Sequence, residues 1–236
     1  MKFLKFFSLL IITLLSTGCV TIPFNEVPKP TGDKNIGTES IELIDIDRLE
    51  WFTEDPQDLR KIMIQIWYPT DDLDGEKELY IDYGELRIEA LASQFDYSPF
   101  LFKKLIDVET NSIKKAKPST QSSFPLIIFS HGLGGNRTQN TVIIEELTSH
   151  GYVVIAIEHA YDANISIFDN GDVANYRSGI NYERRNTQEI TPEEFWAIRL
   201  PQLETRAEDV SYIIDQLELG NLPGNIVNII DLENIG

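Results

Sequence analysis

The stretch that decides the fold is residues 124–159, which read FPLIIFSHGLGGNRTQNTVIIEELTSHGYVVIAIEH. It opens with a continuous apolar run, 124–129, of the kind that forms a strand buried on both faces of a parallel sheet. A glycine-rich loop follows, then a helical segment over 138–150 that ends at Gly151, and a second apolar run over 152–157. This order predicts a βαβ unit, and therefore a parallel sheet covered by helices.

The rest of the chain extends this core in both directions. Residues 62–68 are rich in β-branched and aromatic side chains and stop at Pro69, which predicts another strand. The mixed segment 70–120 and the polar segment 160–190 are expected to be insertions between core elements. The last residues, 225–236, are again apolar and have the pattern of a strand that is beginning.

A long helix is expected between the polar insertion and the final strand. Thr191 is suited to the N-cap, proline follows at the first helical position, and Glu194 completes a capping box. Pro201 is expected to break or kink this helix. Beyond it, an apolar stripe with helical spacing is predicted to pack on the sheet: Leu203, Ala207, Val210, Ile214 and Leu217.

Length and charge limit the possible classes of protein. The chain has 236 residues, 42% of them hydrophobic, which is enough for one sizeable core and predicts a single domain. Lys and Arg number 20 against 38 Asp and Glu, for a formal net charge of -18. Because binding of nucleic acid requires a basic face, no nucleic acid partner is expected. The acidic residues are spread along the chain and indicate a well hydrated surface.

The N-terminus has the layout of an export signal. Two lysines precede an apolar run over 6–15, which is short for a membrane span, and small residues lead to Cys19. The sequence before this cysteine resembles the lipobox of bacterial lipoproteins, with Ser16 where that motif usually has leucine. We therefore expect 1–18 to be a lipoprotein signal peptide and Cys19 to be acylated. Simple secretion or an uncleaved anchor are the alternatives.

An acylated cysteine would place the protein outside the cytoplasm. We expect a membrane-anchored lipoprotein of the cell envelope, on its periplasmic or outer face. Residues 19–40 contain several prolines and no apolar periodicity, which indicates a linker, and 41–236 would form a partial catalytic domain. Since the chain has one cysteine, it has neither an internal disulfide nor a cysteine cluster for zinc.

The glycine loop is the candidate for chemistry. Ester hydrolysis by a serine enzyme needs a nucleophile, a histidine base held by a carboxylate, and backbone N–H groups aimed at the developing oxyanion. His131 opens the loop, and Gly132 and Gly134 flank Leu133, which would allow the Leu133 amide to face a site at the end of the strand. The alternative is a glycine turn with no catalytic task.

The same stretch resembles a known family. The sequence from Phe129 to Arg137, the segment Ser149-His150-Gly151, and the strand that ends at Glu158-His159 resemble plasma-type platelet-activating factor acetylhydrolases and their dienelactone-hydrolase-like bacterial relatives. The resemblance implies an incomplete α/β-hydrolase fold, the N-terminal half to two-thirds of a mainly parallel sheet with flanking helices. It also implies hydrolysis of short acyl esters of lipids and phospholipids, with the Leu133 amide as an oxyanion donor and with neither cofactor nor metal.

The sequence departs from that family in two ways. No Gly-x-Ser-x-Gly motif occurs, so the nucleophile and the triad acid and histidine are expected to be absent and the chain alone inactive. Ala160 stands where the family usually has arginine. His159 with Asp162 is the one acid–base candidate, and no serine or cysteine is expected beside it. The remaining hypotheses are a non-catalytic lipoprotein remnant and an esterase of the dienelactone or polyester hydrolase kind.

Overall fold

The computed structural model describes residues 24–236; the predicted signal peptide and Cys19 lie outside the described residues. The strands are β1 (Asn35–Leu49), β2 (Leu59–Thr70), β3 (Lys77–Leu79), β4 (Glu109–Lys114), β5 (Phe124–Ser130), β6 (Val153–His159), β7 (Ile165–Ile167), β8 (Val173–Asn175) and β9 (Ile230–Ile235). The helices are α2 (Gly84–Gln94), the 3-10 helix η1 (Pro99–Asp107), α3 (Thr141–Ser149), α4 (Gly179–Asn186), α5 (Pro192–Glu218) and α6 (Gly224–Val227).

Seven of these strands form one mixed sheet in the order β3-β4-β1-β2-β6-β5-β9. The β5–α3–β6 segment is a βαβ unit, and β5 pairs in parallel with both β6 and β9. On the other side β2 runs antiparallel to β6, and β2 continues through Pro69 to Thr70 rather than stopping before the proline. The α/β fold predicted from the sequence is thus confirmed, with parallel and antiparallel pairings in the same sheet.

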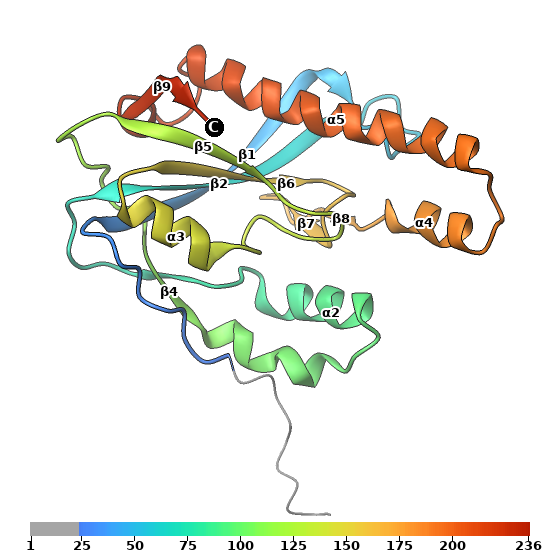
Figure 1. Cartoon of the computed structure of the whole chain (residues 1–236), viewed down its shortest axis with the longest axis horizontal. Helices are drawn as coiled ribbons and strands as arrows, with labels where there is room; N and C mark the ends of the chain where they lie inside the picture. Colours follow the sequence, from blue (N-terminus) through green and yellow to red (C-terminus); the bar gives the residue numbers. More distant parts are fainter. Residues whose placement is uncertain (1–23) are drawn as a thin grey trace, which may run out of the picture.

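Helices cover both faces of the sheet, as Figure 1 shows with α5 on one side and α3 on the other. Alternation along β2 sends Ile62, Ile64 and Ile66 into the core beneath α5, while Trp67 packs with Ile144 of α3. Since β2 and β6 are buried on both faces, their side chains divide between two hydrophobic layers. The ends of these strands are consequently held in place from both sides.

The helix α5 differs in part from the prediction. The capping box is present, because the Thr191 hydroxyl accepts from the Glu194 amide at 3.1 Å and the Glu194 carboxylate accepts from the Thr191 amide at 2.8 Å. The helix runs unbroken through Pro201, so a break there is wrong. Leu203, predicted to be in the buried stripe, is 40% exposed, and the face toward the sheet instead includes polar side chains such as Asp209.

The predicted linker is partly folded onto the domain. β1 begins at Asn35, inside the range 19–40 given to the tether. Just before it, the Thr31 amide donates to the Glu146 carboxylate at 2.7 Å, and the Gly32 amide donates to the Ser149 hydroxyl at 3.0 Å. The segment that leads into the sheet is therefore fastened to the C-terminal end of α3.

Candidate active site

The glycine loop after β5 lies at the edge of the sheet where β5 and β6 end. Gly134 has a φ of 70°, which favours glycine, and its amide donates to the Asp162 carbonyl at 2.9 Å. The Gly135 amide donates to the Gly132 carbonyl, also at 2.9 Å, and closes a tight turn around Leu133. Within residues 24–236 the Leu133 amide has no hydrogen-bond acceptor. The oxyanion role of this amide stays a prediction.

His131 is a structural anchor of this loop. The His131 side chain is buried, and its Nε2 accepts a hydrogen bond of 3.2 Å from the His159 amide, so the ring proton lies on Nδ1. Nδ1 in turn donates to the Gly132 carbonyl at 2.6 Å. Burial, followed by the nearby His159, lowers the pKa of His131 to about 4. His131 is therefore neutral at pH 7 and ties the loop to β6.

A second histidine at the same edge joins a serine to an aspartate. Nε2 of His159 lies 2.7 Å from the Ser130 hydroxyl, and Nδ1 lies 2.8 Å from the Asp209 carboxylate. Ser130 ends β5 and is exposed, whereas His159 and Asp209 are both fully buried. We call these three residues the relay. The expectation that no serine stands near His159 is wrong.

Two arginines hold the acid end of the relay. Arg60 of β2 donates to both carboxylate oxygens of Asp209, at 3.0 and 2.6 Å, and Arg48 of β1 donates at 2.9 Å. Burial alone would raise the pKa of the Asp209 carboxyl, but Arg60 and His159 outweigh it and hold the pKa well below its usual range. Burial also lowers the pKa of His159. At neutral pH the relay thus contains a carboxylate and a neutral imidazole.

Asp162, predicted as the partner of His159, belongs to a different set of contacts. Its carboxylate accepts from the Ser178 hydroxyl and from Arg206 at 3.2 Å, and it lies 3.5 Å from Arg199. Arg206 of α5 also donates to the Ser130 hydroxyl at 3.0 Å and to the His131 carbonyl. The His159–Asp162 pairing is therefore wrong, and Arg206 links α5 to the start of the glycine loop and to the segment that follows β6.

A second buried polar group lies behind the loop, and we call it the ion-pair cluster. It consists of two acids and two arginines: Asp82, Arg87, Arg137 and Glu158. Glu158 lies 3.1 Å from Arg87 and 2.9 Å from Arg137, and Asp82 contacts both arginines. Because Arg87 belongs to α2 and Arg137 to the loop, this cluster fastens the helical insertion to the glycine loop.

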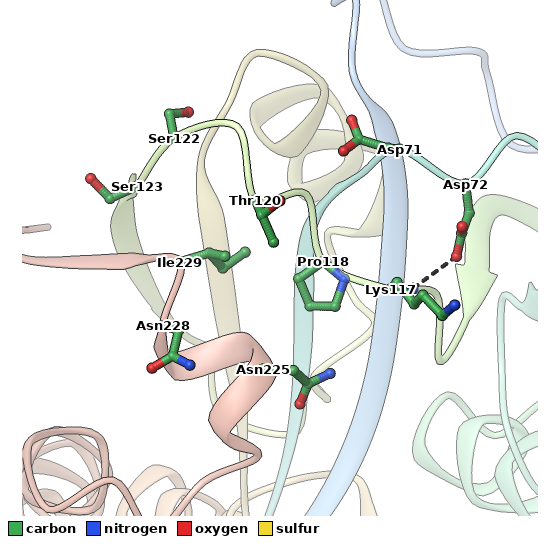
Figure 2. A pocket seen from close by; sticks show the side chains of 10 residues that line it. All are labelled: Asp71, Asp72, Lys117, Pro118, Thr120, Ser122, Ser123, Asn225, Asn228 and Ile229. Carbon is green, nitrogen blue, oxygen red and sulfur yellow. Dashed lines mark hydrogen bonds between the residues drawn. The ribbon is translucent and has the colours of Figure 1, made fainter.

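Two cavities lie at opposite edges of the sheet. One, of about 430 Å³, is bounded by the glycine loop and by apolar side chains of the insertion, among them Tyr80, Ile81, Leu91, Phe95 and Leu105. A wider one, of about 840 Å³, lies at the start of β5 and the end of β2. Figure 2 shows its polar lining, with the Lys117 amide bonded to Asp72. Only the first cavity adjoins the candidate site.

Metal binding finds no support in the part of the chain that the structure describes. No group of three or more His, Cys, Asp or Glu side chains is placed to hold a metal ion within residues 24–179 and 184–236.

The chain matches a family model and is similar to several known proteins. A model of the family described as "Platelet-activating factor acetylhydrolase, isoform II" matches residues 23–234. The platelet-activating factor acetylhydrolase of Cavia porcellus is 29% identical over 215 residues, which cover 87% of this chain and 44% of the relative. That of Bos taurus is 30% identical over 176 residues, 72% of this chain and 39% of the relative. The chain thus spans less than half the length of these relatives.

A solved structure shares the fold. The ferulic acid esterase from Streptomyces cinnamoneus superposes with a TM-score of 0.68 at 24% sequence identity, over 90% of this chain and 54% of that one.

Proposed function

The chain belongs to the platelet-activating factor acetylhydrolase isoform II family, and from this we propose that its site serves the hydrolysis of short acyl esters of lipids by a serine carboxylesterase mechanism. The observation that carries this proposal is the Leu133 amide, which has no partner within residues 24–236. It stands on a glycine-flanked turn at the end of a buried strand, where a backbone N–H can stabilise negative charge on an ester oxygen.

The neighbouring cavity supports a lipid ester as the substrate class. Its volume of about 430 Å³ falls within the usual range of small-molecule sites. The loop supplies polar backbone on one side and the insertion supplies aromatic and aliphatic side chains on the other. Such a lining is suited to an acyl or alkyl chain whose carbonyl group lies near Leu133.

The proposed mechanism also requires a nucleophilic serine on a Gly-x-Ser-x-Gly elbow. The 236 residues contain no Gly-x-Ser-x-Gly sequence. We propose that this elbow is supplied by sequence encoded after Gly236 and that the present chain lacks the family's main activity. The DNA beyond the codon for Gly236 tests this directly: an elbow motif encoded soon after is expected, and its absence from all three reading frames would contradict the proposal.

The role of the Leu133 amide is tested by a matched pair of variants in a product extended to include the elbow. Leu133→Pro removes the N–H, and we expect kcat for p-nitrophenyl acetate to fall by about 10²–10³-fold, as for other lost oxyanion donors. Leu133→Ala keeps the amide and shortens only the side chain, so kcat should stay within about threefold. Equal values for the two variants, both folded by circular dichroism, would refute the oxyanion role.

We further propose that Cys19 is acylated and that the protein is exported and held at a membrane of the cell envelope. The supporting observation is the lipobox-like sequence before Cys19, which lies outside the described residues. Among residues 24–236 no helix is long and apolar enough to cross a membrane. Incorporation of labelled palmitate into the wild-type chain, but not into Cys19→Ser, is the expected result. Equal labelling of both would contradict the proposal.

A further inference from the structure

The relay has the order of contacts found in an activated serine. A serine hydroxyl becomes a nucleophile when a neutral imidazole accepts its proton and a carboxylate fixes that imidazole by binding its other nitrogen. Here Ser130 lies 2.7 Å from Nε2 of His159, and Asp209 lies 2.8 Å from Nδ1. Both distances fall within ordinary hydrogen-bonding range.

The surroundings of Asp209 determine the tautomer. Arg60 and Arg48 keep the carboxylate ionised, and an ionised carboxylate only accepts hydrogen bonds. The proton of His159 must therefore lie on Nδ1, where it is donated to Asp209. This leaves the lone pair of Nε2 directed at the Ser130 hydroxyl, which is the arrangement that general-base catalysis requires.

Ser130 is also open to solvent and close to a positive charge. It is exposed at the end of β5, although His159 and Asp209 of the relay are buried. The Arg206 guanidinium donates to the Ser130 oxygen at 3.0 Å. Such a contact stabilises negative charge that develops on that oxygen as its proton leaves. Arg206 is itself held by Asp162 at 3.2 Å.

We propose that Ser130, His159 and Asp209 form a second nucleophilic serine site, distinct from the elbow of the family, that reacts with activated carboxylic esters. Ser130 Oγ bonds to the carbonyl carbon while its proton passes to His159. The carbon–oxygen bond to the leaving alcohol then breaks, and that alcohol takes the proton. Water, deprotonated by His159, attacks the acyl-serine, the bond to Oγ breaks, and the proton returns to Ser130.

This proposal stands apart from the family's main activity. Every residue in it lies within residues 24–236, and none of its steps needs the Leu133 amide or an elbow serine. The 236-residue chain can therefore be tested as it exists. Failure of this proposal would leave the proposed lipid ester hydrolase function untouched, and the converse also holds.

A fluorophosphonate probe provides the first test. Its phosphorus bonds to an activated serine oxygen while fluoride leaves and the serine proton passes to the base. We expect the purified chain to be labelled at Ser130, as mapped by peptide mass spectrometry, and Ser130→Ala to lose at least about 100-fold in labelling rate. The control is Ser122→Ala, an exposed loop serine at the opposite edge of the sheet, whose labelling should match wild type. An unlabelled chain, or labelling that survives Ser130→Ala, overturns the proposal.

A cysteine variant provides a test that does not depend on the probe. In a Cys19→Ser background, Ser130→Cys places a thiol beside His159, and we expect iodoacetamide at pH 7 to modify it at least about tenfold faster than Ser122→Cys. Adding His159→Gln should slow the reaction of Ser130→Cys, provided that circular dichroism shows a folded chain. If Ser130→Cys and Ser122→Cys react at equal rates while His159 is present, the relay is only a structural bridge and the proposal fails.

Discussion

The relay and the ion-pair cluster meet the same glycine loop from opposite faces of one strand. Glu158 and His159 are consecutive residues of β6, so their side chains point to opposite sides of the sheet. Glu158 joins Arg87 and Arg137, whereas His159 joins Asp209 and the exposed Ser130. Both groups contain buried charged side chains.

The difference between them lies in access and in titration. The titratable groups of the ion-pair cluster are two guanidinium groups and two carboxylates. The relay contains a neutral imidazole, which can accept a proton, and it reaches solvent through Ser130. Buried charges by themselves therefore indicate that a cluster stabilises the fold. Catalysis also requires a group that can exchange a proton and that a substrate can reach.

The largest expected loss of stability comes from a substitution in the ion-pair cluster. Glu158→Gln leaves Arg87 and Arg137 sharing Asp82 alone, and breaking a buried pair in this way is expected to lower the free energy of unfolding by about 3–5 kcal/mol. Urea denaturation measures it. Glu218→Gln, an exposed change near the end of α5, serves as the control and should stay within about 0.5 kcal/mol. If the two variants lose equally little stability, the cluster does not fasten the loop.

A smaller effect is expected from pH, and it tests the buried imidazole of His131, which accepts a hydrogen bond from the His159 amide. The folded pKa of His131, about 4, lies below the ordinary 6.5, so the unfolded chain binds more protons between these values. The contribution of His131 to the free energy of unfolding is therefore fully present above about pH 6.5. About 3 kcal/mol of it is lost as the pH drops to 4. His159 acts in the same direction. Asp82, whose pKa two arginines hold below its usual range against the opposing effect of burial, loses its contribution only at lower pH.

Urea unfolding of wild type and His131→Gln across this range measures the effect. The variant should show a shallower decline between pH 6.5 and pH 4, because one of the two buried imidazoles no longer titrates. If the free energy of unfolding declines equally with pH in the wild type and in His131→Gln, His131 is not held neutral by the fold.

The sequence predicts the βαβ core because its signals are local. The apolar runs of β5 and β6, and the Gly151 cap with its φ of 92°, each lie within a few residues of the element that they define. The capping box at Thr191 is equally local, and the structure confirms it. The resemblance to the platelet-activating factor acetylhydrolase family is confirmed by the matching family model.

The relay escaped prediction because its members are distant in the chain. Asp209 lies 50 residues beyond His159 and resembles a surface acid next to Glu208, so nothing in the local pattern marks it as buried. The stripe predicted on α5 assumed that an apolar face covers the sheet, whereas Arg199 and Asp209 occupy part of that face. One signal was available: Ser130 and His159 both end buried strands, and such ends meet at one edge of a parallel sheet.

If Cys19 is acylated as proposed, the attachment of Thr31 and Gly32 to α3 would limit the distance between the domain and the lipid bilayer. Thr31 follows Cys19 by twelve positions in the chain, and a fully extended chain spans at most about 3.5 Å per residue. An acyl group on Cys19, as proposed, would keep the end of α3 within roughly 40 Å of the headgroups. The domain would then meet the lipids of its own membrane at a high effective concentration, whereas lipids dispersed in bulk water would have no such advantage.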